Sequence, residues 1–129
     1  MRITDTALSL NVDDVDASAS WVEQHLGFGR QMEADGFVSL RHPDAALNLI
    51  FLRTGIETFK PASVAGRADG LLVVFVVDDV DAEYLRLKAE GATVVTPVET
   101  EPWGERYFQV ADPNGVVYQL VQWVHEPPA

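Results

Sequence analysis

The chain has 129 residues, no cysteine and a formal net charge of −11, and 47% of its residues are hydrophobic. This length and composition fit one globular domain, and the lack of cysteine excludes disulfides, thiolate metal sites and cysteine nucleophiles. The acidic balance argues against a nucleic-acid partner, because phosphate binding needs a basic surface. The apolar runs are too short to span a membrane and there is no signal-peptide pattern, so the sequence predicts a cytoplasmic protein with no membrane partner.

The first predicted elements are a strand and an amphipathic helix. Residues 6–12 alternate large apolar side chains with small or polar ones, which is the period of a half-buried strand. A helix is expected at 15–26, with Asp14 as its N-cap and Gly27 at its end. His25 falls on the apolar stripe of this helix, where a buried histidine is more common than a ligand.

Three short strands are expected after this helix. They cover residues 29–34, 37–41 and 46–53. Asp35-Gly36 forms the turn between the first two strands. His42-Pro43-Asp44 separates the second from the third, because proline ends a strand and fixes the backbone. The first part of the chain therefore has the order β-α-β-β-β.

The same order of elements returns in the second half of the chain. The hexapeptide at 12–17 recurs unchanged at 77–82 and again precedes a helix pattern. The second series comprises a strand at 71–77, a helix at 80–90, and strands at 93–98, 105–111 and 116–124. Asp112-Pro113-Asn114-Gly115 is a strong turn signal before the last strand. Two matched strand–cap–helix units indicate a duplicated module.

These boundaries give the expected domain organisation. We expect a single α+β domain over residues 1–129, built from a βαβββ module at 4–53 and a second at 70–124. Residues 54–69 form the linker between them, with glycines, a proline and no clear periodicity. Residues 125–129 form a tail with two prolines.

The duplicated pattern resembles the vicinal oxygen chelate superfamily, which includes glyoxalase I, extradiol dioxygenases and bleomycin-binding resistance proteins. The resemblance covers residues 6–123. It is carried by the paired modules, the Val-x-Asp cap before each helix, Leu26-Gly27-Phe28, and the turn at 112–115. It implies the glyoxalase/bleomycin resistance fold, in which tandem modules form a curved, largely antiparallel sheet with a concave cavity. It also implies a homodimer.

Enzymes of this superfamily usually bind one divalent metal ion through four side chains. The resemblance places these positions at Ala7, Asn48, Leu72 and Gln119. Two of them have no donor atom and the other two have neutral amides, whereas a divalent ion needs imidazole or carboxylate ligands. We therefore expect no metal and no cofactor. A metal site relocated to the histidines or to the acidic residues has no motif to support it.

The resemblance also implies that one face of each strand points toward the cavity. The expected ligand-binding residues are Ser9, Asn48, Ile50, Trp103, Tyr107, Gln109, Gln119 and Trp123. Trp103 lies in a segment similar to the Pro-Trp-Gly-x-Arg stretch of the drug-binding branch. An apolar and aromatic wall with few polar groups suits a planar organic ligand. Alternatively, Tyr107 and Trp123 fill the sheet interior or a subunit interface, and Trp103 pins a loop.

The leading hypothesis is a metal-independent protein that binds a small aromatic antibiotic or metabolite and acts by sequestration. The acidic surface would attract a cationic ligand, although solubility alone also explains the charge. The alternative is a lyase, isomerase or dioxygenase-like enzyme with a non-standard or relocated metal site. Its acid–base groups would have to come from Glu105, Glu33, His42 or Arg41. A regulatory or subunit-interaction module is a third reading, with no positive sign in the sequence.

Overall fold

The structure is a computed structural model that describes residues 1–56 and 62–124. The chain divides into two compact units, Met1–Asp69 and Gly70–Ala129, and the division falls at the end of the predicted linker. Part of that linker, residues 57–61, and the predicted tail at 125–129 lie outside the described residues. Neither helix found in the described ranges has the length and apolar content of a membrane span.

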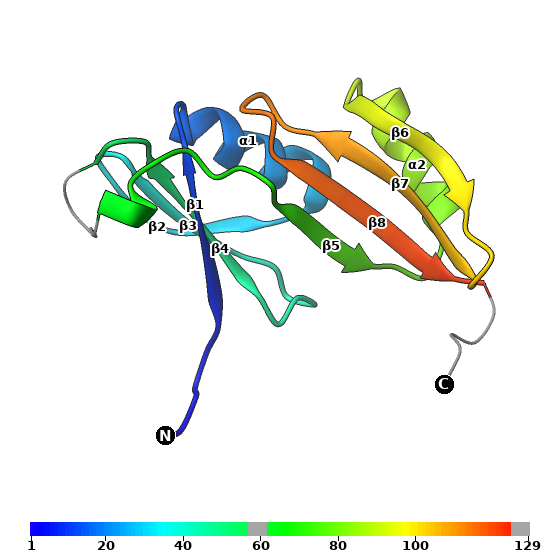
Figure 1. The fold of residues 1–129 in the computed structure, drawn as a ribbon, viewed down its shortest axis with the longest axis horizontal. Helices are drawn as coiled ribbons and strands as arrows, with labels where there is room; N and C mark the ends of the chain where they lie inside the picture. Colours follow the sequence, from blue (N-terminus) through cyan, green and yellow to red (C-terminus); the bar gives the residue numbers. More distant parts are fainter. Residues whose placement is uncertain (57–61, 125–129) are drawn as a thin grey trace. The chain divides into compact units, whose positions relative to one another are not determined.

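The first unit is a βαβββ module (Figure 1). Its elements are β1 (Ala7–Val12), α1 (Val15–Leu26), β2 (Gly29–Ala34), β3 (Phe37–Arg41) and β4 (Asn48–Arg53), and the short 3₁₀ helix η1 (Ala62–Val64) follows. The strand order in the sheet is β1-β4-β3-β2. β1 runs parallel to β4, and the other neighbours are antiparallel.

The second unit repeats this plan. Its elements are β5 (Leu72–Val76), α2 (Val80–Ala89), β6 (Thr93–Thr100), β7 (Glu105–Ala111) and β8 (Val117–Trp123). The strand order is β5-β8-β7-β6, with β5 parallel to β8. The predicted α+β class with two tandem βαβββ modules is confirmed, and in the described residues each module forms a four-stranded mixed sheet. The strand and helix boundaries agree with the predicted ones to within about two residues.

The repeated hexapeptide begins both helices in the same way. The Asp14 carboxylate accepts a hydrogen bond from the backbone N–H of Ala17 at 3.1 Å, and Asp79 accepts from Ala82 at the same distance. These bonds satisfy N–H groups that the first helical turn leaves without partners. Gly27 ends α1 with φ of 76°, a left-handed conformation that favours glycine. The predicted caps are therefore present in both modules.

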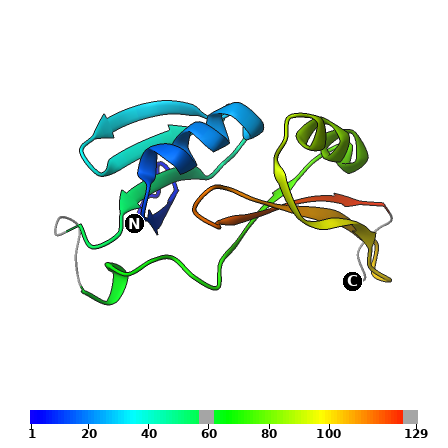
Figure 2. The ribbon, with the colours of Figure 1, turned by 90° about the horizontal axis from the view of Figure 1, so that it is seen from above.

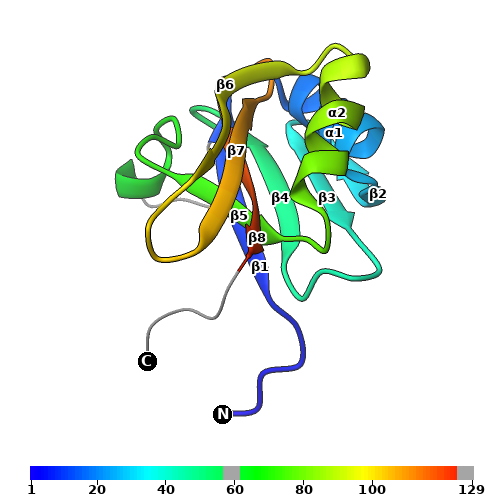
Figure 3. The ribbon, with the colours of Figure 1, turned by 90° about the vertical axis from the view of Figure 1, so that its right-hand side faces the viewer.

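Each helix covers one face of its own sheet (Figures 2 and 3). In the first unit, the buried side chains between helix and sheet include Leu10, Val12, Val22, Leu40, Leu49 and Phe51. In the second unit they include Val80, Leu87, Phe108, Val110, Tyr118 and Leu120. Because strand side chains alternate between the two faces, this core fixes which residues lie on the face opposite each helix.

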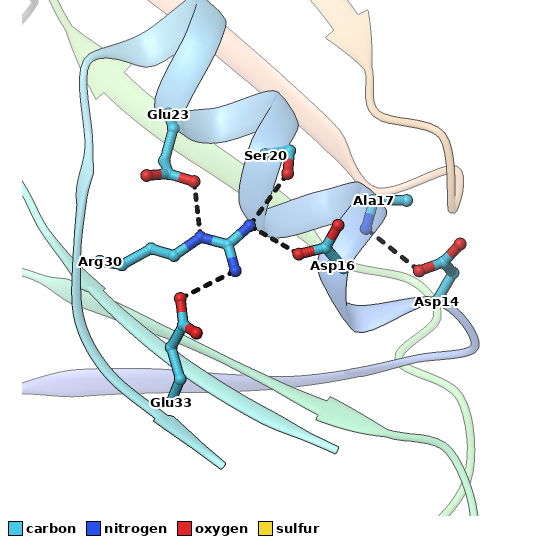
Figure 4. A network of polar contacts seen from close by, with 7 residues as sticks. All are labelled: Asp14, Asp16, Ala17, Ser20, Glu23, Arg30 and Glu33. Carbon is cyan, nitrogen blue, oxygen red and sulfur yellow. Dashed lines mark hydrogen bonds and ion pairs between the residues drawn. The ribbon is translucent and has the colours of Figure 1, made fainter. Parts of the chain in front are cut away.

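Arg30 joins α1 to β2 through a network of charged hydrogen bonds (Figure 4). Its Nε donates to Glu23 at 2.6 Å and its Nη1 to Glu33 at 3.0 Å. Its Nη2 donates to Asp16 at 2.8 Å and to the Ser20 hydroxyl at 2.9 Å. The bond to Glu23 is the largest of the contacts that raise the pKa of Arg30. All three nitrogens of this planar guanidinium donate bonds that tie helix to sheet, in a geometry that a lysine cannot reproduce.

Replacing Arg30 with methionine is expected to lower the free energy of unfolding by about 1–3 kcal/mol, because charge-assisted bonds are lost and the carboxylates then repel one another. Urea denaturation measures the change. Arg53→Met is the control, since the Arg53 contact to Asp35 is exposed and 3.3 Å long. An exposed pair of this kind contributes about 0–1 kcal/mol. Equal losses in the two variants would contradict a structural role for the Arg30 network.

Candidate functional site

The face of the first sheet opposite α1 is defined by strand register. Ile50 on β4 lies between Ser9 on β1 and Ser39 on β3. The next row along the strands consists of Asn11, Leu52 and Phe37. The two rows place small polar side chains beside apolar and aromatic ones, as a ligand surface requires.

A cavity of about 660 Å³ lies over these rows. The sheet contributes Ser9, Asn11, Phe37, Ile50 and Leu52 to its lining, and residues 63, 64 and 66–69 contribute the rest. Its volume is within the range of small-molecule sites, roughly 300–1,000 Å³. The structure therefore brings the predicted residues Ser9 and Ile50 together in one cavity, which also includes residues from the predicted linker.

Asn11 holds the segment at 63–69 against the sheet. Its side-chain Nδ2 donates to the carbonyl oxygens of Val64 and Gly66, the latter at 2.9 Å. The backbone N–H of Ala68 donates to the Asn11 carbonyl oxygen at 3.0 Å. Figure 1 shows this segment, in green, passing across β1. Asn11 is 8% exposed, so it acts here as a structural residue that positions the cavity wall.

Replacing Asn11 with aspartate is expected to release this segment, because a carboxylate cannot donate and would face two carbonyl oxygens. Loss of these bonds lowers the free energy of unfolding by about 1–3 kcal/mol. Hydrogen exchange at the Ala68 amide should become faster. Ser9→Ala on the same strand is the control and should leave this exchange unchanged. Unaltered protection of the Ala68 amide in the aspartate variant would contradict the role given to Asn11.

Asn48 is engaged elsewhere on the same face. Its Nδ2 donates to Asp5 Oδ2 at 3.0 Å, and Arg41 Nη2 donates to that same oxygen at 2.7 Å. The backbone N–H of Thr6 is the main cause that lowers the pKa of Asp5. Asn48 does not line the cavity, and its amide nitrogen already has a carboxylate partner. Asn48 therefore lies outside the cavity that Ser9 and Ile50 line, although all three were expected to bind the ligand.

The second sheet presents the other predicted residues on the face opposite α2. Gln109 pairs with Gln119, and Tyr107 pairs with Val121 one row further along. Trp123 lies at the end of β8 and is 40% exposed. Trp103 lies in the connection between β6 and β7 and is also exposed. Aromatic and amide side chains therefore share this face or its edge within the second unit.

A row of hydrogen bonds crosses this face from strand to strand. The Thr96 hydroxyl donates to Gln109 Oε1 at 2.7 Å, and Gln109 Nε2 donates to Gln119 Oε1 at 2.8 Å. On the far side of Gln119, its β5 neighbour is Val74. The sequence analysis did not identify Thr96, because the register of β6 shifts on both sides of this residue.

The Tyr107 hydroxyl lies beside two acidic side chains. It donates to Glu101 at 2.9 Å and lies 3.5 Å from a Glu99 oxygen. The hydrogen bond to Glu101, with the nearby negative charges, raises the pKa of Tyr107 to about 12. Tyr107 is therefore a neutral phenol at pH 7. The negative charge collected around it disfavours an anionic ligand.

The two sheets also show which residues occupy equivalent positions in the modules. Ser9 and Val74 are equivalent in the repeat, since each lies three residues before the valine of the hexapeptide. Ser9 pairs with Ile50, whereas Val74 pairs with Gln119. Gln119 therefore corresponds to Ile50 and not to Asn48, so the predicted equivalence was wrong by two residues. A shift of two keeps every side chain on its face, which is why sequence alternation did not reveal the error.

The donor set at the metal positions of the superfamily does not fit a divalent ion. Ala7, Leu72 and Ile50 have no side-chain donor. The Gln119 oxygen already accepts from Gln109. Among the described residues, no three His, Cys, Asp or Glu side chains are grouped so that they could hold a metal ion. Divalent ions bind where carboxylates or imidazoles offset the cost of dehydration, and these positions offer neither.

The chain belongs to the glyoxalase/bleomycin resistance protein/dioxygenase superfamily, because the model of this family matches residues 3–120. The resemblance expected from the repeated modules and turns is therefore confirmed. The family includes enzymes and binding proteins, so membership alone does not assign an activity.

Solved structures show the same fold. A glyoxalase/bleomycin resistance protein/dioxygenase from Nocardioides is 24% identical with a TM-score of 0.82, covering 100% of this chain and 89% of that one. TioX from Micromonospora sp. ML1 is 23% identical with a TM-score of 0.72, covering 94% and 99%. Lactoylglutathione lyase from Agrobacterium tumefaciens is 19% identical with a TM-score of 0.76, covering 94% of each chain. At these identities the likeness establishes the fold.

Similar sequences occur in mycobacteria. The uncharacterized protein Mb0911c of Mycobacterium bovis is 42% identical over 72 residues, which are 56% of this chain and 46% of that protein. The uncharacterized protein Rv0887c of Mycobacterium tuberculosis matches at the same identity over 41% of its length. The match thus spans less than half the length of these curated relatives.

Proposed function

We propose that this protein binds a small, largely apolar organic molecule, such as an aromatic antibiotic or metabolite, and sequesters it without a metal ion. The observation that carries the proposal is the cavity of about 660 Å³ over the first sheet. Its lining includes the apolar side chains of Phe37, Ile50, Leu52 and Val64. In addition, the positions that bind a metal ion in other members of the family lack suitable donors in this chain. A cavity of this kind supplies binding energy through apolar burial and orientation through a few polar groups.

The charge distribution supports a neutral or cationic ligand. The chain has a net charge of −11, which gives its surface a negative field. Such a field raises the local concentration of cations and repels anions, most strongly at low ionic strength. An aromatic cation can also lie against an exposed tryptophan such as Trp103.

Three of the four groups that an enzymatic alternative would draw on, all but Glu105, are used in structural contacts. Glu33 is paired with Arg30, and Arg41 is paired with Asp5. The ring nitrogen Nδ1 of His42 accepts a hydrogen bond from the backbone of its own turn. General acid–base catalysis needs a side chain that is free to exchange a proton and lies within hydrogen-bond reach of the reacting group. Stoichiometric binding uses the cavity without requiring such a side chain.

Filling the cavity should weaken binding. A panel of planar aromatic compounds, neutral and cationic, is titrated into the protein while tryptophan fluorescence is followed. The compound that binds most tightly is then titrated into two variants. Ser9→Phe places a ring in the cavity and should weaken this compound at least tenfold. Ala7→Phe is the matched control, because Ala7 lies on the same strand and face but does not line the cavity. It should change affinity less than twofold.

Two results would count against the proposal. One is a panel in which no compound binds below about millimolar concentration, which is about 4 kcal/mol of affinity. The other is a binder that tolerates Ser9→Phe and Ala7→Phe equally well. Circular dichroism spectra confirm that both variants are folded before the titrations are compared.

We also propose that the protein forms a homodimer. The edge strand β5 exposes Leu72, Val74 and Val76, the last with 66% of its surface accessible. An exposed apolar edge of this kind is usually covered in native proteins. Light scattering should give twice the chain mass of 14.2 kDa. Val76→Lys should shift this mass toward the monomer, and a wild-type mass equal to one chain would contradict the proposal.

A further inference from the structure

The segment at 63–69 forms one wall of the cavity, yet it is not packed like a core element. Residues 63, 64 and 66–69 line the cavity, but each of residues 63–69 is exposed or half-buried. Val64 keeps 58% of its surface accessible. A segment that buries so little apolar surface gains little free energy from packing. Its attachment to the sheet therefore depends mainly on hydrogen bonds.

Hydrogen bonds attach this segment to the first unit at two places. One place is Asn11 on β1, whose side chain donates to the Gly66 carbonyl oxygen and whose own carbonyl oxygen accepts from the Ala68 N–H. The other is Gly55, whose N–H donates to the Ala65 carbonyl oxygen at 3.0 Å. Ala65 lies next to Gly66 in the chain, so we expect the bonds at the two places to form and break together.

The residue before Gly55 has a buried hydroxyl group without a partner. The Thr54 Oγ1 atom is the one buried side-chain nitrogen or oxygen in the described ranges that makes no hydrogen bond. The Thr54 backbone is well bonded, since its N–H donates to the Val12 carbonyl oxygen at 3.0 Å. A buried hydroxyl without a partner costs free energy that it recovers when water reaches it.

Thr54 lies where the sheet and the segment meet. It follows β4 directly, and its neighbour Gly55 holds the segment at Ala65. Detachment of the segment breaks the Gly55 bond and opens the surroundings of Thr54 to water. The hydroxyl then gains partners in the detached state that it lacks in the attached state. The Thr54 hydroxyl therefore opposes the bonds that Asn11 makes.

From these observations we infer that residues 63–69 form a cover that detaches from the first sheet as one unit and controls the release of a ligand from the cavity. The Asn11 bonds favour the attached state, and the buried Thr54 hydroxyl favours the detached state. Because the cover is part of the cavity lining, a bound ligand contacts it and leaves when it detaches. The control of release rests on the proposed function, whereas the detachment does not.

Hydrogen exchange in the absence of any ligand tests the detachment. The Gly55 amide donates to Ala65 and the Ala68 amide donates to Asn11, so each bond crosses between the cover and the sheet. Both amides should exchange with the same opening free energy. Different opening free energies at the two amides would overturn detachment as one unit.

Thr54→Val removes the hydroxyl and keeps the branched shape of the side chain. Exchange at the Gly55 and Ala68 amides should become about tenfold slower, because the cost of the unpartnered hydroxyl is removed from the attached state. Thr54→Ser retains a hydroxyl and should not show this slowing. Thr96→Val is the matched control and should leave both amides unchanged, since the Thr96 hydroxyl has a partner in the second sheet. Unchanged or faster exchange in Thr54→Val would overturn the role given to Thr54.

Asn11→Asp should produce the opposite change at both amides. Gly55 donates to Ala65 and not to Asn11, so faster exchange at Gly55 as well as at Ala68 shows that the cover detaches as a whole. The Asn48 amide, which donates to the Thr6 carbonyl oxygen at 3.0 Å, reports on the sheet itself and should stay unchanged. Faster exchange at Ala68 alone would overturn the inference.

Ligand release is tested with the compound of the aromatic panel that binds most tightly. Thr54 lies outside the described lining of the cavity, so Thr54→Val changes the cover without removing a ligand contact. In stopped-flow displacement, the compound should dissociate about tenfold more slowly from Thr54→Val than from wild type, in proportion to the change in exchange. It should dissociate from Thr96→Val at the wild-type rate. A dissociation rate that stays the same while amide exchange slows would overturn the control of release by the cover.

The outcomes distinguish the inference from the function on which part of it rests. Independent exchange at the two amides would overturn the cover and leave ligand binding in the cavity as proposed. A panel without any binder would overturn the proposed function and the control of release, but the exchange measurements would still decide whether the cover detaches.

Discussion

Parallel pairing of the first and last strands of each module is the constraint on which the rest of this structure depends. β1 lies beside β4 and β5 lies beside β8, although the strands of each pair are far apart in the module. This pairing fixes the register, and the register decides which side chains face the helix and which face away. On the helix side it gathers apolar residues such as Leu10, Phe51 and Leu120 into two cores. On the other side it builds the surfaces from which the function is inferred.

The duplicated modules have diverged on those outer faces while keeping the same core and caps. Asn11 in the first module holds residues 63–69 over the sheet, whereas its equivalent Val76 leaves β5 exposed. Ile50 contributes to a cavity floor, whereas its equivalent Gln119 ends a row of hydrogen bonds. One module therefore forms a cavity between its sheet and residues 63–69, and the other an open face crossed by a row of hydrogen bonds. Such changes on one face leave helix–sheet packing intact, which is how one fold can carry different sites.

Much of the fold could be predicted because its signals are local. The Asp14 and Asp79 caps, the alternation in residues 6–12 and the turn at Asp112 all depend on neighbours close in the sequence. The family resemblance followed from these local signals and from their repetition. It also indicated which strand faces to examine, and the register shows that Tyr107, Gln109 and Gln119 share one face.

The contacts of the site residues could not be predicted because they depend on long-range register and on segments without periodicity. The equivalence of Gln119 with Asn48 was wrong by two residues, a shift that preserves alternation. The attachment of residues 63–69 to Asn11 has no sequence signature, since an asparagine in a strand does not indicate its partner. Thr96 was missed because irregular pairing of β6 hides its place in the row. The binding roles given to Ser9, Ile50, Trp103, Trp123 and the other expected ligand-binding residues stay predictions.

Independence from metal ions is the claim most directly open to measurement. Protein dialysed exhaustively against chelator can be titrated calorimetrically with the tightest aromatic binder, before and after one equivalent of zinc, nickel, manganese or iron is added. Because the superfamily's metal positions carry only neutral amides and aliphatic side chains in this chain, we expect the same affinity and stoichiometry in every titration. Binding that disappears on chelation and returns with one of these metals would contradict the account of the site given above.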